Sequence, residues 1–127
     1  MKVLCRKIIS PNGKDLGDNS PWLKLGKEYL VLAIVLAENS SMQIYIQTED
    51  NHEPHFFGLS GFEFINQNIP SLWITKIIEV NGRKVMTMLP ASWNYESFFE
   101  DMENQDLKAI ELFNKEVEQM YREEVLL

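Results

Sequence analysis

The sequence GKEYLVLAIVLAENSSMQIYIQTED, residues 26–50, decides the fold that we expect for this chain. Its first apolar run, residues 29–37, is apolar at both odd and even positions, which predicts a strand covered on both faces. Residues 42–47 instead alternate between apolar side chains such as Ile44 and polar or amphipathic ones such as Tyr45. That alternation predicts a strand with one face in water. Two strands alone are not stable, so we expect further strands and a helix to complete the core.

The N-terminal segment predicts one more strand and a loop. Residues 1–9 are expected to open the sheet, with Cys5 on its buried side as a small, unreactive core residue. Residues 10–21 are rich in Pro, Asn, Gly and Asp, which predicts a loop. We expect the apolar residues that follow this loop to plug one end of a small barrel by packing alone: Trp22, Leu23 and Leu25.

Further strands are predicted on the C-terminal side of the central pair. Residues 56–59 and 62–66 are short apolar segments separated by Ser60-Gly61. Residues 74–80 and 83–89 flank Asn81-Gly82, a dipeptide typical of a two-residue hairpin turn because both of its positions require positive φ. Short turns join neighbouring strands, so we expect five to six strands in antiparallel order.

The last quarter of the chain is predicted to be helical. Residues 93–103 fit a short helix capped by Ser92 or Asn94, and residues 104–106 interrupt it. A long helix then runs to near the C-terminus, with an apolar stripe at helical spacing that we expect to pack on the sheet: Ile110, Phe113, Val117, Met120 and Tyr121. The expected fold is therefore α+β, a small antiparallel SH3-like barrel or bent sheet with a C-terminal helical segment.

Length and composition predict one globular domain. The chain has 127 residues, of which 45% are apolar, and we divide the single domain into a β-rich part, 1–89, and a helical appendage, 90–127. The sequence contains no apolar run of about 20 residues and no signal peptide pattern. Cys5 is the only cysteine, so no internal disulfide can form and a reducing compartment is expected. We therefore expect a cytoplasmic protein without membrane contact.

The formal net charge of −7 is located in the C-terminal segment. Residues 1–89 contain nine acidic and nine basic side chains, whereas residues 90–127 contain ten acidic side chains against three basic ones. Two interpretations stay open, a solvated acidic helix and a surface for a basic partner. Direct nucleic-acid binding is disfavoured, because phosphate contacts need clustered Lys and Arg.

The sequence lacks the common signatures of catalysis and metal binding. It has no glycine-rich phosphate loop, no nucleophile elbow and no zinc ligand spacing. His52 and His55 lie beside acidic residues, but Pro54 disfavours a helix there and no cysteine can join them. We therefore expect a polar hairpin loop, no cofactor, no metal and no enzymatic activity.

Several segments in succession carry a resemblance to a known class of proteins. They are GKEYLVLAIV, IYIQTED, GFEFI, IPSLW and YESFFEDMENQDLKAIELFNKEV, which together span roughly residues 26–117. This order of segments resembles small bacterial immunity proteins that accompany secreted or contact-dependent toxins. The resemblance implies an SH3-like, partly open barrel with a helical appendage, and the neutralisation of one cognate toxin. It implies no binding residue by position.

We therefore expect an immunity protein that inhibits the C-terminal domain of a cognate, basic nuclease-type toxin by stoichiometric binding. Its carboxylates would meet the Lys and Arg side chains that otherwise hold nucleic-acid phosphates. The alternative is a non-catalytic interaction module or regulator in a bacterial complex. We expect the free protein to be a monomer.

Two acidic patches are candidates for the binding surface. The first lies on the predicted barrel loop and consists of Glu49, Asp50 and Glu53. The second surrounds the break between the predicted helices and consists of Glu100, Asp101 and Glu103. We favour the second, because Phe98 or its neighbour Phe99 would add an aromatic anchor to the charges.

Overall fold

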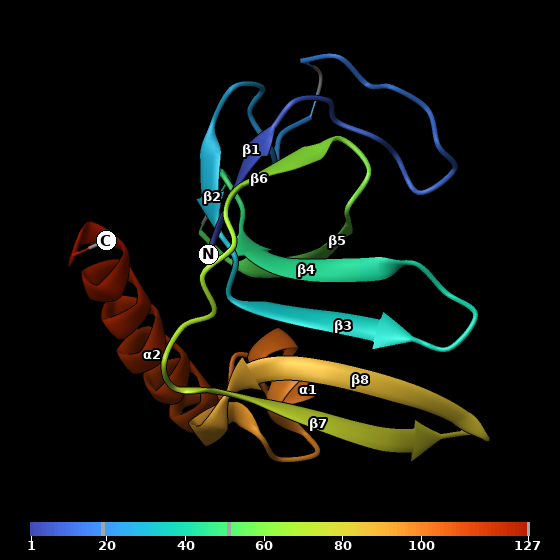
Figure 1. Ribbon diagram of the computed structural model, residues 1–127. Helices are drawn as coiled ribbons and strands as arrows, with labels where there is room; N and C mark the ends of the chain where they lie inside the picture. Colours follow the sequence, from blue (N-terminus) through green and yellow to red (C-terminus); the bar gives the residue numbers. More distant parts are fainter. Residues whose placement is uncertain (19, 51, 127) are drawn as a thin grey trace.

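The computed structural model describes residues 1–18, 20–50 and 52–126, and shows an α+β protein with two antiparallel sheets and a C-terminal helix (Figure 1). The elements in this part of the chain are β1 Lys2–Cys5, β2 Glu28–Leu30, β3 Ala33–Ala37, β4 Met42–Gln47, β5 Pro54–Gly58, β6 Phe62–Asn66, β7 Trp73–Val80, β8 Arg83–Pro90, the 3-10 turn η1 Ala91–Trp93, α1 Phe98–Glu103 and α2 Leu107–Leu126.

The strands form a three-stranded sheet, in the order β2-β1-β6, and a five-stranded sheet, in the order β5-β4-β3-β8-β7. Every pair of neighbours is antiparallel, as predicted. The described strands do not close into a barrel, and they number eight rather than five to six. The prediction of an α+β fold with antiparallel strands and a C-terminal helix is confirmed, whereas a barrel is not.

The apolar run 29–37 is divided between the two sheets. The Val31 N–H donates to the carbonyl of Met1 at 3.0 Å, and the next N–H, of Leu32, donates to the carbonyl of Tyr45 at 2.8 Å. Consecutive residues are thus bonded to different sheets, so the prediction of one continuous strand here is wrong. The run is apolar at both parities because the chain is enclosed where it passes from one sheet to the other.

The face of β4 that we expected to meet water is covered at Tyr45, whereas Gln43 on the same face is exposed, as expected. Tyr45 is only 4% exposed. Its ring centroid lies 5.0 Å from that of Phe99 in α1 and 6.4 Å from that of Phe113 in α2. Tyr45 tolerates either environment because its ring is apolar and its hydroxyl polar, so the alternation alone did not reveal the covering helices.

The helical segment differs in detail from the expectation. Residues 93–103 form η1, a short connection and α1, and the residue before α1 is Ser97 rather than Ser92 or Asn94. The long helix α2 begins after Asp106, whose carboxylate accepts a hydrogen bond from the Ala109 N–H at 3.1 Å. Asp106 is thus the N-cap of α2, because its side chain accepts a hydrogen bond from a backbone N–H that has no partner within the helix.

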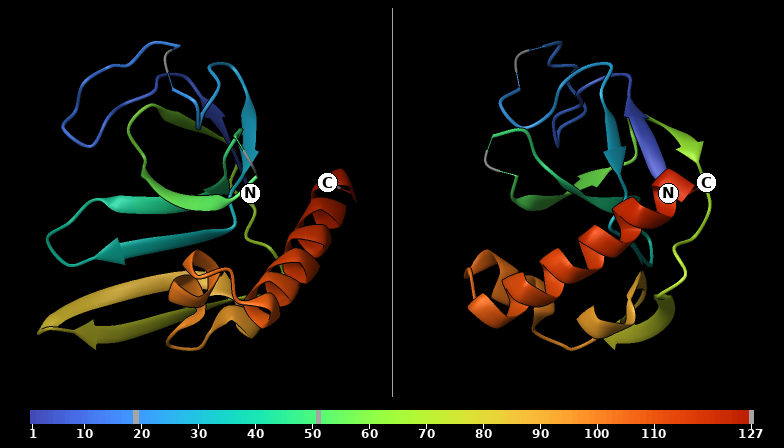
Figure 2. Two further views of the ribbon diagram at one scale, coloured as in Figure 1. Left: turned by 180° about the vertical axis from the view of Figure 1, so that it is seen from behind. Right: turned by 90° about the vertical axis from the view of Figure 1, so that its left-hand side faces the viewer.

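Helix α2 spans both sheets, and Figure 2 shows it running diagonally across the molecule toward the N-terminus. Phe113, Val117 and Met120 of the predicted stripe are buried. Ile110 is only half buried, and Tyr121 is 49% exposed, so the stripe is narrower than predicted. Near the end of α2, Glu124 lies 3.0 Å from the amino group of Met1 and accepts a hydrogen bond from Asn66 at the end of β6.

The N-terminal segment is more open than predicted. Strand β1 ends at Cys5, and Ile9 forms only an isolated bridge with Asp15. Cys5 is fully buried, as predicted, and burial raises the pKa of its thiol. Leu23 is buried, but Trp22 is 51% exposed, so the prediction that Trp22 plugs the core is wrong.

No helix in the described residues is long and apolar enough to cross a bilayer.

We expect Phe113→Ala to lower the free energy of unfolding by about 3–5 kcal/mol, because the deletion leaves a cavity between α2 and the sheet. Leu107, 82% exposed on the same helix, gives the matched control. Leu107→Ala should change stability by no more than about 0.5 kcal/mol. Urea unfolding measures both, and equal losses in the two variants would contradict this packing.

The Asn81-Gly82 hairpin is confirmed, because these residues have φ of +52° and +78° and join β7 to β8. We expect Gly82→Val to lower the melting temperature clearly, since a β-branched side chain is strained at positive φ. Lys84→Ala, two residues away on β8, should leave the melting temperature nearly unchanged. Similar melting temperatures for both variants would show that the turn does not constrain the fold.

Candidate functional site

The first predicted acidic patch lies in the loop between β4 and β5, and Glu49 is bound within the protein itself. Its carboxylate lies 2.5 Å from the ammonium of Lys27 and accepts a hydrogen bond from the hydroxyl of Tyr29 at 2.9 Å. The bond to Lys27 in particular lowers the pKa of Glu49, against the opposing effect of its partial burial. Glu49 therefore has a structural role in holding this loop against residues 27–29.

The other two acidic residues of this loop are held by Thr48 and face a different neighbour. The Thr48 hydroxyl is hydrogen bonded to the Asp50 carboxylate and to the Glu53 carbonyl. The Glu53 carboxylate accepts a hydrogen bond from the side-chain amide of Gln105 at 3.3 Å. It also lies 3.9 Å from the Nε2 atom of His55.

The second predicted patch, at α1, is exposed in part. Glu100 and Glu103 are exposed, and Asp101 is half buried and accepts a hydrogen bond from the Ser97 hydroxyl at 3.1 Å. Phe98 is fully buried, with its ring stacked on that of Trp93 at 4.9 Å. Phe98 therefore has no exposed surface to offer a partner in this structure, because its aromatic ring is packed in the core.

The tertiary structure brings Glu53 of the first patch close to the turn that follows Glu103 of the second patch. Gln105, in the turn after Glu103, bonds to Glu53 across 52 positions of sequence. Burial raises the pKa of Tyr45 in β4, and Glu103 lies close enough for its charge to raise that pKa further. We call Asp50, Glu53 and Glu103 the acidic surface.

Trp22, which the sequence predicts to lie in the core, is an aromatic residue beside this surface. Its carbonyl accepts a hydrogen bond from the Glu49 N–H at 2.8 Å, which fixes it next to the β4–β5 loop. About half of its side chain is exposed. The sequence held one signal for this, because Trp22 follows Pro21 and a polar loop rather than lying within an apolar strand.

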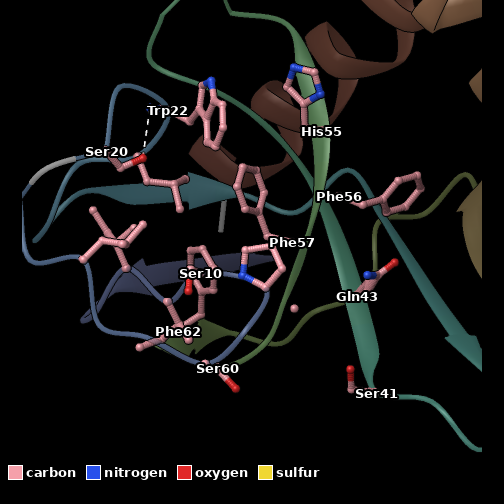
Figure 3. A pocket seen from close by; sticks show the side chains of 17 residues that line it. Ser10, Ser20, Trp22, Ser41, Gln43, His55, Phe56, Phe57, Ser60 and Phe62 are labelled. Carbon is pink, nitrogen blue, oxygen red and sulfur yellow. Dashed lines mark hydrogen bonds between the residues drawn. The ribbon is translucent and has the colours of Figure 1, made fainter.

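A pocket of about 580 Å³ opens below Trp22, lined by residues from 8–16 and 20–23 and by residues of β4, β5 and β6. Figure 3 shows the Phe57 ring turned into this pocket, with Phe62 near it, and Phe56 turned away. His55 lies near Trp22 at the mouth. Ser10, Ser20, Ser41, Ser60 and Gln43 add hydroxyl and amide groups to an otherwise apolar lining. Such a volume and lining suit an apolar side chain or small molecule.

The described residues contain no group of three or more His, Cys, Asp or Glu side chains arranged to hold a metal ion. His52 and His55 therefore do not come together with the loop carboxylates as a ligand set in this part of the structure. Instead, His55 lies at the mouth of the pocket, within 3.9 Å of one carboxylate, that of Glu53.

No family model matches the sequence, and no curated protein or solved structure was found to be similar to the chain.

The ion pair of Glu49 should make stability depend on pH. Because its pKa is lowered in the folded protein, the contribution is present above about pH 4.3, the ordinary pKa of Glu, and is lost as pH falls through the folded value. We expect Glu49→Gln to destabilise the protein at pH 7, with the difference from wild type shrinking toward pH 3. Urea unfolding across this range measures it. Glu28→Gln, at an exposed position on β2, is the control, and an equal effect there would contradict a special role for Glu49.

Proposed function

We propose that this chain is an immunity protein that binds the C-terminal domain of a cognate, basic nuclease-type toxin and neutralises it stoichiometrically. The observation that carries the proposal is the hydrogen bond of 3.3 Å between Gln105 and Glu53, which assembles two acidic segments distant in sequence into one surface. An aromatic residue, Trp22, is exposed beside that surface. Tryptophan is one of the residue types enriched among those that dominate binding energy.

The electrostatics of the acidic surface support this role. A nuclease holds phosphates with Lys and Arg, and carboxylates form charge-assisted hydrogen bonds with the same groups. Asp50, Glu53 and Glu103 would therefore compete with substrate for the groove of the toxin. A net charge of −7 would also speed the encounter with a basic partner. The role requires no catalytic group.

The pocket below Trp22 supports a specific mode of contact. An apolar side chain of the toxin would enter the pocket between Trp22 and Phe57, while basic residues around it would meet Glu53 at the rim. This arrangement replaces Phe98 as the source of apolar contact. Burying one aromatic or aliphatic side chain in such a pocket contributes roughly 1.5–3 kcal/mol.

The same proposal covers the fold family and the location. We propose that the two bent sheets are a variant of the SH3-like barrel in which the outer strands stay unpaired with each other. We also propose a cytoplasmic location, which is supported by the single, buried cysteine and is the compartment where a nuclease toxin would act.

The test is co-expression with the C-terminal domain encoded immediately upstream of this gene, followed by a growth rescue assay and a pull-down. We expect rescue and a stoichiometric complex. If cells die although the folded protein is abundant, and no complex forms at micromolar concentration, the immunity proposal fails.

Variants then test the surface. Trp22→Ala should weaken the complex by about 2 kcal/mol, or about 30-fold in Kd. Glu53→Lys combined with Glu103→Lys should slow association strongly, more so at low salt. Glu118→Lys, at an exposed site on α2, is the control for changed charge. A complex that forms but is insensitive to all of these variants would show that another surface binds.

A further inference from the structure

Strand β7 is an apolar edge strand that the proposed function does not use. It is the last strand of the five-stranded sheet, and no described strand pairs with its outer side. Residues 74–80 are exposed on both faces, and Ile77 is 67% exposed. Proteins usually protect such edges with proline, bulges or several charges. Strand β7 contains no proline, and its register with β8 is unbroken from Trp73 to Val80.

The backbone groups that face outward are the odd-numbered ones. The Ala91 N–H donates to the Leu72 carbonyl at 2.9 Å, which shows that even-numbered residues of this segment turn their polar groups toward β8. Backbone groups alternate in direction along a strand. Thr75, Ile77 and Glu79 therefore direct their N–H and C=O groups to the open edge, where only water or another strand can satisfy them.

The side chains next to this edge form an apolar row across the sheet. Ile77 is paired with Met86, Met86 with Leu36, and Leu36 with Met42. The last three are half buried, and a shallow hollow lined by Leu36, Ile77 and Met86 lies along the row. An extra strand beyond Ile77 would extend the row and cover its open end.

We propose that two copies of this chain pair through their β7 edges, antiparallel and around a twofold axis at Ile77, to form one continuous ten-stranded sheet. Around this axis Ile77 lies opposite Ile77, Thr75 opposite Glu79, Lys76 opposite Ile78, and Ile74 opposite Val80. No like charges are directly opposite, and residues 74–80 are all paired. This is a closed contact between identical surfaces, as in most symmetric dimers.

The alternative registers of self-pairing are less favourable. An axis at Lys76 places two lysines opposite each other, and an axis at Glu79 does the same with two glutamates, which destabilises the pair. An axis at Ile78 shortens the paired part of β7 to residues 76–80, and one at Thr75 shortens it to 73–77. Only the axis at Ile77 combines a long paired segment with the absence of like charges.

The charge distribution favours a second copy as the occupant. The hairpin 73–90 contains three basic residues and one acidic residue, although the chain as a whole has a net charge of −7. Within residues 74–80, the segment that the two copies bring together, Lys76 and Glu79 balance each other, so the paired segments carry no net charge. The acidic surface is next to β5, at the opposite edge of the same sheet, so a dimer leaves it accessible. A monomer, the state expected from the sequence, would leave the apolar edge of β7 in water.

Sedimentation velocity over a series of protein concentrations tests the dimer, and we expect the wild type to shift from monomer to dimer as concentration rises. Ile77→Glu should weaken association by about tenfold or more, because it removes an apolar contact from each copy and adds facing carboxylates. Ile77→Lys should weaken it less, because Glu79 of the other copy lies diagonally across the axis. Leu107→Lys, at an exposed apolar site on α2, should have no effect.

Mixing the two Ile77 variants in equal amounts tests the twofold register. A lysine and a glutamate then face each other at the axis, so heterodimers should form at concentrations where each variant alone is monomeric. Circular dichroism of each variant verifies that it is folded. A wild type that stays monomeric at every concentration overturns the proposal, as would a mixture that associates no better than its components. Unchanged association in both Ile77 variants would overturn it as well.

Discussion

The stacking of aromatic rings around Trp93 is the contact on which the arrangement of helices and sheets depends. Its ring lies parallel to those of Phe98 and Phe113, with centroids 4.9 and 5.3 Å away. Its indole N–H donates to the carbonyl of Leu112 in α2 at 3.1 Å. Because this one fully buried side chain of η1 contacts both α1 and α2, it fixes the two helices relative to each other where they cover Tyr45.

This covering determines where the polar and charged groups emerge. With α1 and α2 packed on the sheet, the turn between them lies against the loop before β5, and Gln105 meets Glu53 there. At the other edge of the sheet no helix or described strand lies beyond β7, so Ile77 stays exposed. The same packing thus leaves an acidic surface at one edge and an apolar, slightly basic hairpin at the other. Contacts at these two edges would therefore be independent of each other.

The candidate binding surface was predictable only in part. Charge counting located the acidic segments correctly, because the number of carboxylates in a segment does not depend on the fold. It could not show that Glu49 is bound to Lys27 while Glu53 bonds to Gln105, because ion pairs form between residues that only folding brings together. Phe98 is buried and Trp22 is exposed, the reverse of what was predicted, since an aromatic residue fits a core or a surface equally well.

Local patterns by themselves determined the elements whose signal lies within a few residues. The Asn81-Gly82 hairpin, strand β4 and the long helix after Asp106 follow from turn chemistry, alternation and helical spacing, which act between near neighbours. Only the tertiary structure decided that the run 29–37 divides between two sheets and that β7 has no strand beyond it. Both features depend on which strands pair with each other. Strand pairing depends on contacts between segments far apart in the chain, and a local sequence pattern does not contain that information.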